Sequence, residues 1–173
     1  MKKMHNSKIL VVDDSSTNIV LLEAILNGQG YQIETAQSVK EAYQIIRKEN
    51  IHLILLDLLM PKISGYDFLK EIKGNENTKN IPVVIVSAVG DPENKKKSIE
   101  LGANDFINKP IDIQEFLDKV ESILKKKESL AWIFFSNFIT FYSKASIIVC
   151  KKGNYLYSGW RITRKINYQN HRC

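Results

Sequence analysis

The stretch HLILLDLLMPKISG, residues 52–65, decides the fold of this chain. Four consecutive apolar residues, Leu53 to Leu56, run directly into Asp57, and a proline and a glycine follow. A short, unbroken apolar run is typical of a strand that is buried on both faces, as in a parallel sheet. The carboxylate at the end of this run then needs an explanation.

Similar apolar runs alternate with helical patterns along the first 127 residues. The runs predict strands at 9–12, 31–35, 53–56, 83–86 and 105–107, the second of them half-exposed at an edge. Apolar residues at helical spacing predict a first helix that Ser15 or Ser16 can cap and whose pattern ends at Gly28 and Gly30. Further helices are predicted near 39–46, 66–74 and 92–101, and a last one from Asp112. This alternation indicates crossover connections, and therefore an α/β fold with a parallel sheet covered by helices on both faces.

The net charge of +6 is confined to the end of the chain. Residues 1–127 hold 18 basic and 18 acidic residues, whereas residues 128–173 hold seven basic residues and one acid. All four prolines lie before residue 128, and both tryptophans lie after it. We therefore predict one domain at 7–127 and an atypical basic, aromatic C-terminal extension at 128–173.

The remaining composition favours a cytoplasmic protein. A hydrophobic content of 44% is enough for a substantial core. The first residues are basic, but the apolar run that follows is too short for a signal peptide and meets Asp13 at once. Two cysteines, Cys150 and Cys173, make neither a disulfide framework nor a metal cluster.

Polar side chains follow four of the predicted strands. Asp13 and Asp14 come after the first strand, Asp57 after the third, Ser87 at the end of the fourth and Lys109 after the fifth. Functional groups of open parallel sheets gather at the carboxyl ends of the strands. Clustered carboxylates repel one another unless a cation relieves them, and Mg²⁺ prefers oxygen ligands. A carboxylate can also act as a nucleophile that forms an acyl phosphate, which makes Asp57 the natural acceptor of a phosphoryl group.

Four segments in this order resemble the receiver domain of response regulators, the CheY-like superfamily of two-component signal transduction. They are ILVVDDS (9–15), LILLDLLMPKISG (53–65), PVVIVSA (82–88) and GANDFINKP (102–110). The resemblance covers roughly residues 7–125. It implies a flavodoxin-like, doubly wound sheet of five parallel strands in the order 2-1-3-4-5.

The resemblance also implies the role of each site residue. Asp57 is the phosphoacceptor, and Asp13, Asp14 and Asp57 hold Mg²⁺ together with the backbone carbonyl of Leu59. Lys109 contacts the phosphate. This explains the opening stretch: the apolar run is the central strand, and Asp57 lies where that strand reaches the reactive crevice.

Further positions match the switch of the family. Ser87 takes the Ser/Thr place that moves toward the phosphate, and Phe106 takes the place of the switch aromatic. The Lys109–Pro110 bond is commonly cis in the family. Leu59 and Val89 occupy the positions that tune loss of the phosphoryl group, and because both are apolar we expect a phosphorylated state that lasts minutes to hours.

The partners that the resemblance implies are a sensor histidine kinase or a phosphotransfer protein upstream, and a downstream protein target. The target is expected to bind the face made by the fourth helix, the fifth strand and the fifth helix, and a phosphorylation-dependent homodimer is a further expectation. We expect no dedicated catalytic output domain. Two alternatives remain: a receiver fragment of a longer regulator whose output domain is lost, and a docking pseudo-receiver that works without phosphorylation.

The extension at 128–173 matches no output domain and leaves several interpretations open. Residues 130–150 contain one charged residue, Lys144, and are long enough for a marginal transmembrane helix, but they carry a heavy polar load. Membrane association or partner docking by an amphipathic segment, a set of short strands, and an out-of-frame remnant are the other interpretations. No motif supports nucleic-acid binding.

An aspartyl phosphatase of the haloacid dehalogenase type is a rival from the enzyme class. Such enzymes also use an aspartate nucleophile and Mg²⁺, but they typically carry a D-x-D motif after the first strand. This chain has adjacent Asp13 and Asp14 there, and its acceptor follows the third strand.

Overall fold

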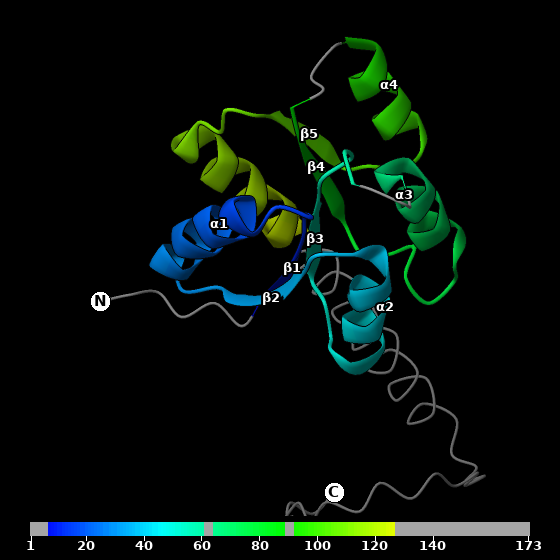
Figure 1. Cartoon of the computed structure of the whole chain (residues 1–173), viewed down its shortest axis with the longest axis horizontal. Helices are drawn as coiled ribbons and strands as arrows, with labels where there is room; N and C mark the ends of the chain where they lie inside the picture. Colours follow the sequence, from blue (N-terminus) through cyan, green and yellow to red (C-terminus); the bar gives the residue numbers. More distant parts are fainter. Residues whose placement is uncertain (1–6, 61–63, 89–91, 127–173) are drawn as a thin grey trace, which may run out of the picture. The chain divides into compact units, whose positions relative to one another are not determined.

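The computed structural model describes residues 7–60, 64–88 and 92–126, which form a sheet of five parallel strands between two layers of helices (Figure 1). The strands are β1 (Lys8–Val12), β2 (Gln32–Ala36), β3 (Leu53–Leu56), β4 (Val83–Ser87) and β5 (Asp105–Asn108). The helices are α1 (Ser16–Gln29), α2 (Val39–Lys48), α3 (Gly65–Gly74), α4 (Pro92–Glu100) and a last helix over residues 113–126. The strand order β2-β1-β3-β4-β5 confirms the predicted topology.

The three central strands are buried along almost their whole length. Every residue of β3 and β4 is buried, and in β1 only Lys8 is partly exposed. The edge strand β2 pairs with β1, and most of its residues stay partly or fully exposed. Because both faces of the central strands are covered, they take unbroken apolar sequences, whereas the edge strand takes a mixed one.

Alternate residues of the strands feed two separate core clusters. One cluster packs strand residues such as Val12, Ile54 and Leu56 against α2 and α3. The other packs their neighbours, such as Val11 and Leu55, against α1 and the helix at 113–126. The period of two along each strand therefore sends successive side chains to opposite faces of the sheet.

A capping serine and a glycine set the two ends of α1. Ser15 is the N-cap of α1, and its side chain accepts a hydrogen bond from the backbone of Asn18. Of the two predicted stops, Gly28 lies inside the helix, and Gly30 ends it with a φ of 90°. Glycine adopts this left-handed conformation without the steric cost that a side chain would bring.

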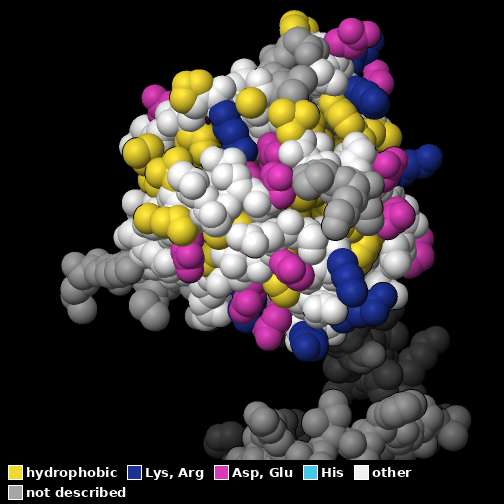
Figure 2. Space-filling view, in the orientation of Figure 1, with side chains coloured by type: hydrophobic (Ala, Val, Ile, Leu, Met, Phe, Trp, Pro, Cys, Tyr) yellow, Lys and Arg dark blue, Asp and Glu magenta, His cyan; other side chains and the backbone are white. Residues whose placement is uncertain are grey.

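The domain boundary at 127 and the extension at 128–173 lie at and beyond the limit of the described residues. Among the described helices, none is both long enough and apolar enough to cross a membrane. Acidic, basic and apolar side chains are interspersed over the face of the described residues that Figure 2 shows.

Candidate functional site

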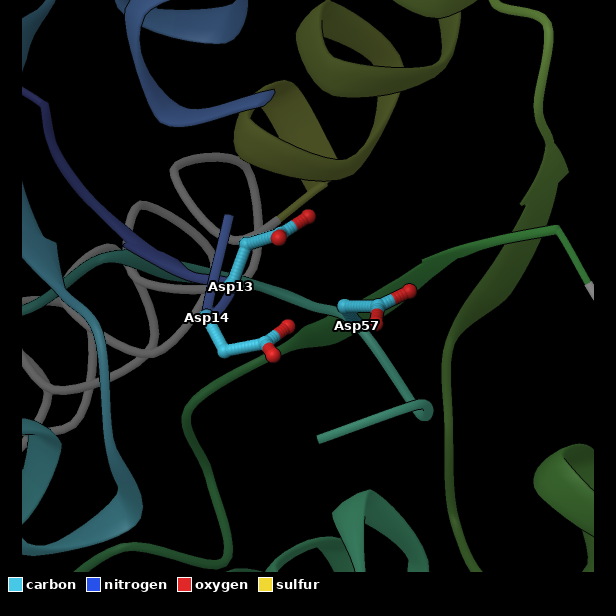
Figure 3. A group of neighbouring side chains, drawn as sticks. All are labelled: Asp13, Asp14 and Asp57. Atoms are coloured by element: carbon cyan, nitrogen blue, oxygen red, sulfur yellow. The ribbon is translucent and has the colours of Figure 1, made fainter. Parts of the chain in front are cut away.

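Three carboxylates meet at the carboxyl edge of the sheet (Figure 3). Asp13 directly follows β1, Asp57 directly follows β3, and one carboxylate oxygen from each of Asp13, Asp14 and Asp57 lies within 4.8 Å of the others. Asp13 and Asp57 are buried, whereas Asp14 is exposed. The backbone positions the two buried acids, because the Asp57 amide donates to the Val12 carbonyl at 2.9 Å and the Asp13 amide donates to the Ala36 carbonyl at 3.1 Å.

Lys109 bridges the two buried carboxylates. Its Nζ lies 2.7 Å from Asp13 Oδ2 and 3.3 Å from Asp57 Oδ1, and its side chain is only 19% exposed. The backbone amide of Lys109 donates to the Ser87 carbonyl at 3.0 Å, which ties the loop after β5 to the end of β4. The Lys109–Pro110 peptide bond is cis, as the sequence resemblance implied.

Asn18, which the sequence pattern did not single out, belongs to the same network. Its side-chain amide donates to Asp13 at 3.1 Å from Oδ1 and 3.0 Å from Oδ2, and the backbone amide of Ser15 also donates to Oδ1 at 2.9 Å. Asn18 lies in the first turn of α1, where an asparagine is ordinary. Its sequence position alone therefore gave no signal that its side chain turns back to Asp13.

The backbone after β3 holds the second oxygen of Asp57. The amide of Leu59 donates to Asp57 Oδ2 at 3.0 Å, while the Leu59 side chain is 56% exposed. Gly65, the first residue of α3, packs directly on this backbone: a Cβ there would lie 2.5 Å from the Asp57 carbonyl oxygen and 2.7 Å from Leu58 Cα. Gly65 is thus required because a side chain at this position would overlap the backbone beside the acidic cluster.

The two predicted switch residues lie on neighbouring strands. Ser87 ends β4 and is fully buried, and Phe106 in β5 is 2% exposed and pairs in register with Ile85. The Phe106 ring belongs to the core cluster under α2 and α3. Val89, the second position expected to tune loss of a phosphoryl group, lies outside the described residues.

The donor set fits a hard divalent cation. It consists of carboxylate oxygens alone, it joins two buried acids to an exposed one, and the exposed Asp14 leaves one side accessible to solvent. Mg²⁺ takes oxygen ligands and retains several waters, so it suits a site with few protein ligands and an open side.

Comparison with known proteins identifies the family of the chain. The profile of the response regulator receiver domain matches residues 9–121. The chain is 38% identical over 129 residues to a probable cyclic di-GMP phosphodiesterase of Vibrio cholerae and 37% identical over 123 residues to the transcriptional regulatory protein CpxR homolog of Haemophilus influenzae. A solved receiver domain, that of the Francisella response regulator 1452, superimposes with a TM-score of 0.66 at 30% identity and covers 70% of this chain and 99% of its own.

The curated relatives are longer than the matching region. The alignments cover 75% and 71% of this chain, but only 29% of the Vibrio protein and 52% of the Haemophilus protein. The names of these relatives therefore describe the activities of longer proteins, and this chain matches only the receiver part of each. By its sequence, its strand order and the residues at its sheet edge, the chain belongs to the response regulator receiver domain family of two-component systems.

Proposed function

We propose that the chain is a phosphorylation-dependent signalling switch in which Asp57 accepts a phosphoryl group from a histidine kinase or a phosphotransfer protein. One observation carries this proposal. Three carboxylates converge at the carboxyl edge of the sheet, and the Lys109 ammonium lies within 3.3 Å of both Asp13 and Asp57. A structural ion pair does not require the third, exposed carboxylate of Asp14 beside it.

The proposed transfer is an in-line displacement. An oxygen of the Asp57 carboxylate forms a bond to phosphorus while the bond from phosphorus to the imidazole nitrogen of the donor breaks. The product is an acyl phosphate on Asp57. Bound Mg²⁺ would supply charge neutralisation for the phosphoryl oxygens and for the clustered acids. Asp13, Asp14, Asp57 and the Leu59 carbonyl are its proposed ligands.

The other site residues have proposed roles that suit their positions. Lys109 exchanges part of its contact with Asp57 for a phosphoryl oxygen, because its ammonium already lies 3.3 Å from Asp57 Oδ1. The Ser87 hydroxyl turns toward the phosphoryl group from the end of β4. The proposed reorientation of Phe106 begins from a ring that is already buried in the core.

The output is proposed to be carried by protein contacts. The face formed by α4, β5 and the helix at 113–126 is the proposed surface for a downstream protein, and a phosphorylation-dependent homodimer is a separate proposed contact. Ile99 in α4 and Ile113 in the last helix are 45% and 55% exposed, which supports an apolar contribution to such a contact. We propose no output enzyme within 7–127, and we propose that 128–173 is a separate extension.

Intact mass after incubation with acetyl phosphate and Mg²⁺ tests the phosphoryl transfer. We expect the protein to gain one phosphoryl group, and we expect both omission of Mg²⁺ and the variant Asp57→Asn to abolish the gain. Asp67→Asn is the matched control, because Asp67 is an exposed acid in the first turn of α3 outside the cluster. A folded, Mg²⁺-binding protein that gains no mass would contradict the proposal and favour the docking pseudo-receiver.

A further inference from the structure

Helix α4 is weakly anchored to the rest of the fold. Of its nine residues, Pro92–Glu100, only Ser98 is buried, and the Ser98 hydroxyl donates to the Asn94 carbonyl within the same helix at 2.8 Å. Neither core cluster of the described residues includes a residue of α4, whereas α3 buries four residues of its own. Elements with few buried apolar contacts open at low free energy, so the position of α4 depends on its remaining contacts.

Tyr66 in the first turn of α3 supplies two of those contacts. Its hydroxyl donates to Asn94 Oδ1 at 2.6 Å, and Lys97 Nζ lies 4.2 Å from the centroid of its ring. Asn94 and Lys97 are three residues apart and share one face of α4. One side chain of α3 thus contacts two successive turns of α4, which lies next to α3 (Figure 1).

The residue before Tyr66 contacts the backbone of the acidic site. Gly65 is packed so closely on the carbonyl of Asp57 that a Cβ would lie 2.5 Å from that oxygen, and its amide donates to the Leu58 carbonyl at 3.3 Å. A shift of the backbone beside Asp57 must therefore displace the first turn of α3, because close-packed backbone cannot absorb it locally. Tyr66 is part of that turn.

We propose that Tyr66 is a positioning residue that holds α4 against α3 and couples the position of α4 to the chemical state of Asp57. The path runs from the Asp57 backbone through Gly65 to Tyr66, and from its ring and hydroxyl to Lys97 and Asn94. The coupling rests on the proposed phosphorylation of Asp57. The proposed role of Tyr66 in holding α4 against α3 does not rest on phosphorylation, because it is a property of the unmodified protein.

Hydrogen exchange of the whole chain, read on peptides covering α4, tests the holding directly. Tyr66→Phe keeps the ring and removes the hydroxyl, and we expect exchange in α4 to be about fivefold faster because one hydrogen bond is lost. Tyr66→Leu removes both contacts and should accelerate exchange further. Tyr43→Phe is the matched control, since the Tyr43 hydroxyl donates to Glu71 and so joins α2 to α3 rather than α3 to α4.

The coupling is tested by repeating the exchange on protein treated with acetyl phosphate and Mg²⁺, with intact mass confirming the modification. In the parent protein we expect exchange in α4 to change on phosphorylation, and in Tyr66→Phe we expect this change to shrink although the mass gain is retained. Equal changes in both proteins would overturn the coupling.

Two further results would overturn the holding of α4. One is unaltered exchange in α4 of unmodified Tyr66→Phe, and the other is equal acceleration by Tyr43→Phe, which would indicate general loosening of α3. If the parent protein gains no phosphoryl mass, the proposed function and the coupling both fail, while the unmodified comparison still decides whether Tyr66 holds α4.

Discussion

The two edges of the sheet each hold a partly buried lysine, and the two lysines have opposite surroundings. At the carboxyl edge, Lys109 Nζ contacts the carboxylates of Asp13 and Asp57. At the amino edge, Lys73 Nζ donates to neutral oxygens, the Ile81 carbonyl at 2.8 Å and Asn104 Oδ1 at 3.2 Å. Burial lowers the pKa of Lys73 below its ordinary value.

The difference in surroundings indicates a structural role for Lys73 and a chemical role for Lys109. The Lys73 ammonium joins the segments that enter β4 and β5, because Asn104 Oδ1 also accepts the Val83 amide at 2.9 Å. Neutral oxygens of Lys79, Ile81 and Asn104 accept from its ammonium, so its three donors are already used within the fold. Lys109 instead neutralises acids that repel one another, so a cation can take its place beside the acids, and a phosphoryl oxygen can take the place of a carboxylate oxygen beside Lys109.

Helix α3 begins at the carboxyl edge with Gly65 and ends with Gly74, which gives a matched pair of substitutions. Gly65→Ala should destabilise the protein by about 3 kcal/mol, because the new methyl group would overlap backbone atoms beside Asp57. Gly74→Ala should be neutral or stabilising by up to about 1 kcal/mol, since a Cβ at that position would have no atom within 4 Å. Urea unfolding measures both, and equal losses would contradict the close packing at the site.

Lys109→Met should cost about 2 kcal/mol of unfolding free energy without Mg²⁺, because the buried carboxylates lose the charged donor that they share. Saturating Mg²⁺ should restore much of this loss, since an ion that binds the folded state stabilises it by mass action. Urea unfolding with Mg²⁺ or with a chelator checks this. A loss that Mg²⁺ leaves unchanged would mean that the acids do not form the cation site.

Lys73→Met should cost about 1 kcal/mol, independent of Mg²⁺, because neutral oxygens lose a donor far from the acids. Its pH dependence has a definite sign. Between the lowered folded pKa of Lys73 and the ordinary value of 10.5, the unfolded chain binds more protons than the folded chain. The stability that this group contributes therefore rises with pH in that window, and it is lost as the pH falls below the folded pKa.

We accordingly expect the stability difference between the parent protein and Lys73→Met to widen as the pH is raised from neutral to 10.5. Urea unfolding across this range measures it. A difference that narrows instead would show that the folded pKa of Lys73 is not lowered.

The smallest expected effect concerns the lifetime of the phosphorylated state. Leu59 carries an exposed apolar side chain, and its amide donates to Asp57 Oδ2. Leu59→Gln should accelerate loss of the phosphoryl group several-fold, because a polar side chain can hold an attacking water beside Asp57. Intact mass measured over time gives the decay rate of the phosphorylated protein. An unchanged decay rate in Leu59→Gln would contradict the proposed role of Leu59.

The sequence predicted the sheet well because its signals are local and strong. Unbroken apolar runs identified β1, β3 and β4, and the polar residues after them identified the edge where Asp13, Asp57 and Lys109 meet. The ends of parallel strands share an edge, so convergence follows from the topology. The order of apolar runs and polar residues in the sequence was therefore enough to predict where these three side chains meet.

The parts that the sequence did not predict depend on side chains that reach across elements. Asn18 turns back to Asp13, Lys73 crosses to the start of β4 and β5, and Tyr66 contacts α4. Each residue is ordinary at its own position in a helix, and nothing in the local spacing specifies its partner. Only the packing of the helices on the sheet brings these pairs together.

The most direct test of the central claim identifies which of the three neighbouring carboxylates carries the phosphoryl group. Protein treated with acetyl phosphate and Mg²⁺ is reduced with borohydride, which converts an aspartyl phosphate to homoserine, and peptide mass spectrometry locates the change. We predict homoserine at position 57 and unaltered aspartate at positions 13 and 14. Homoserine at Asp13 or Asp14, or its absence from all three positions in phosphodonor-treated protein, would contradict the assignment of Asp57 as the acceptor.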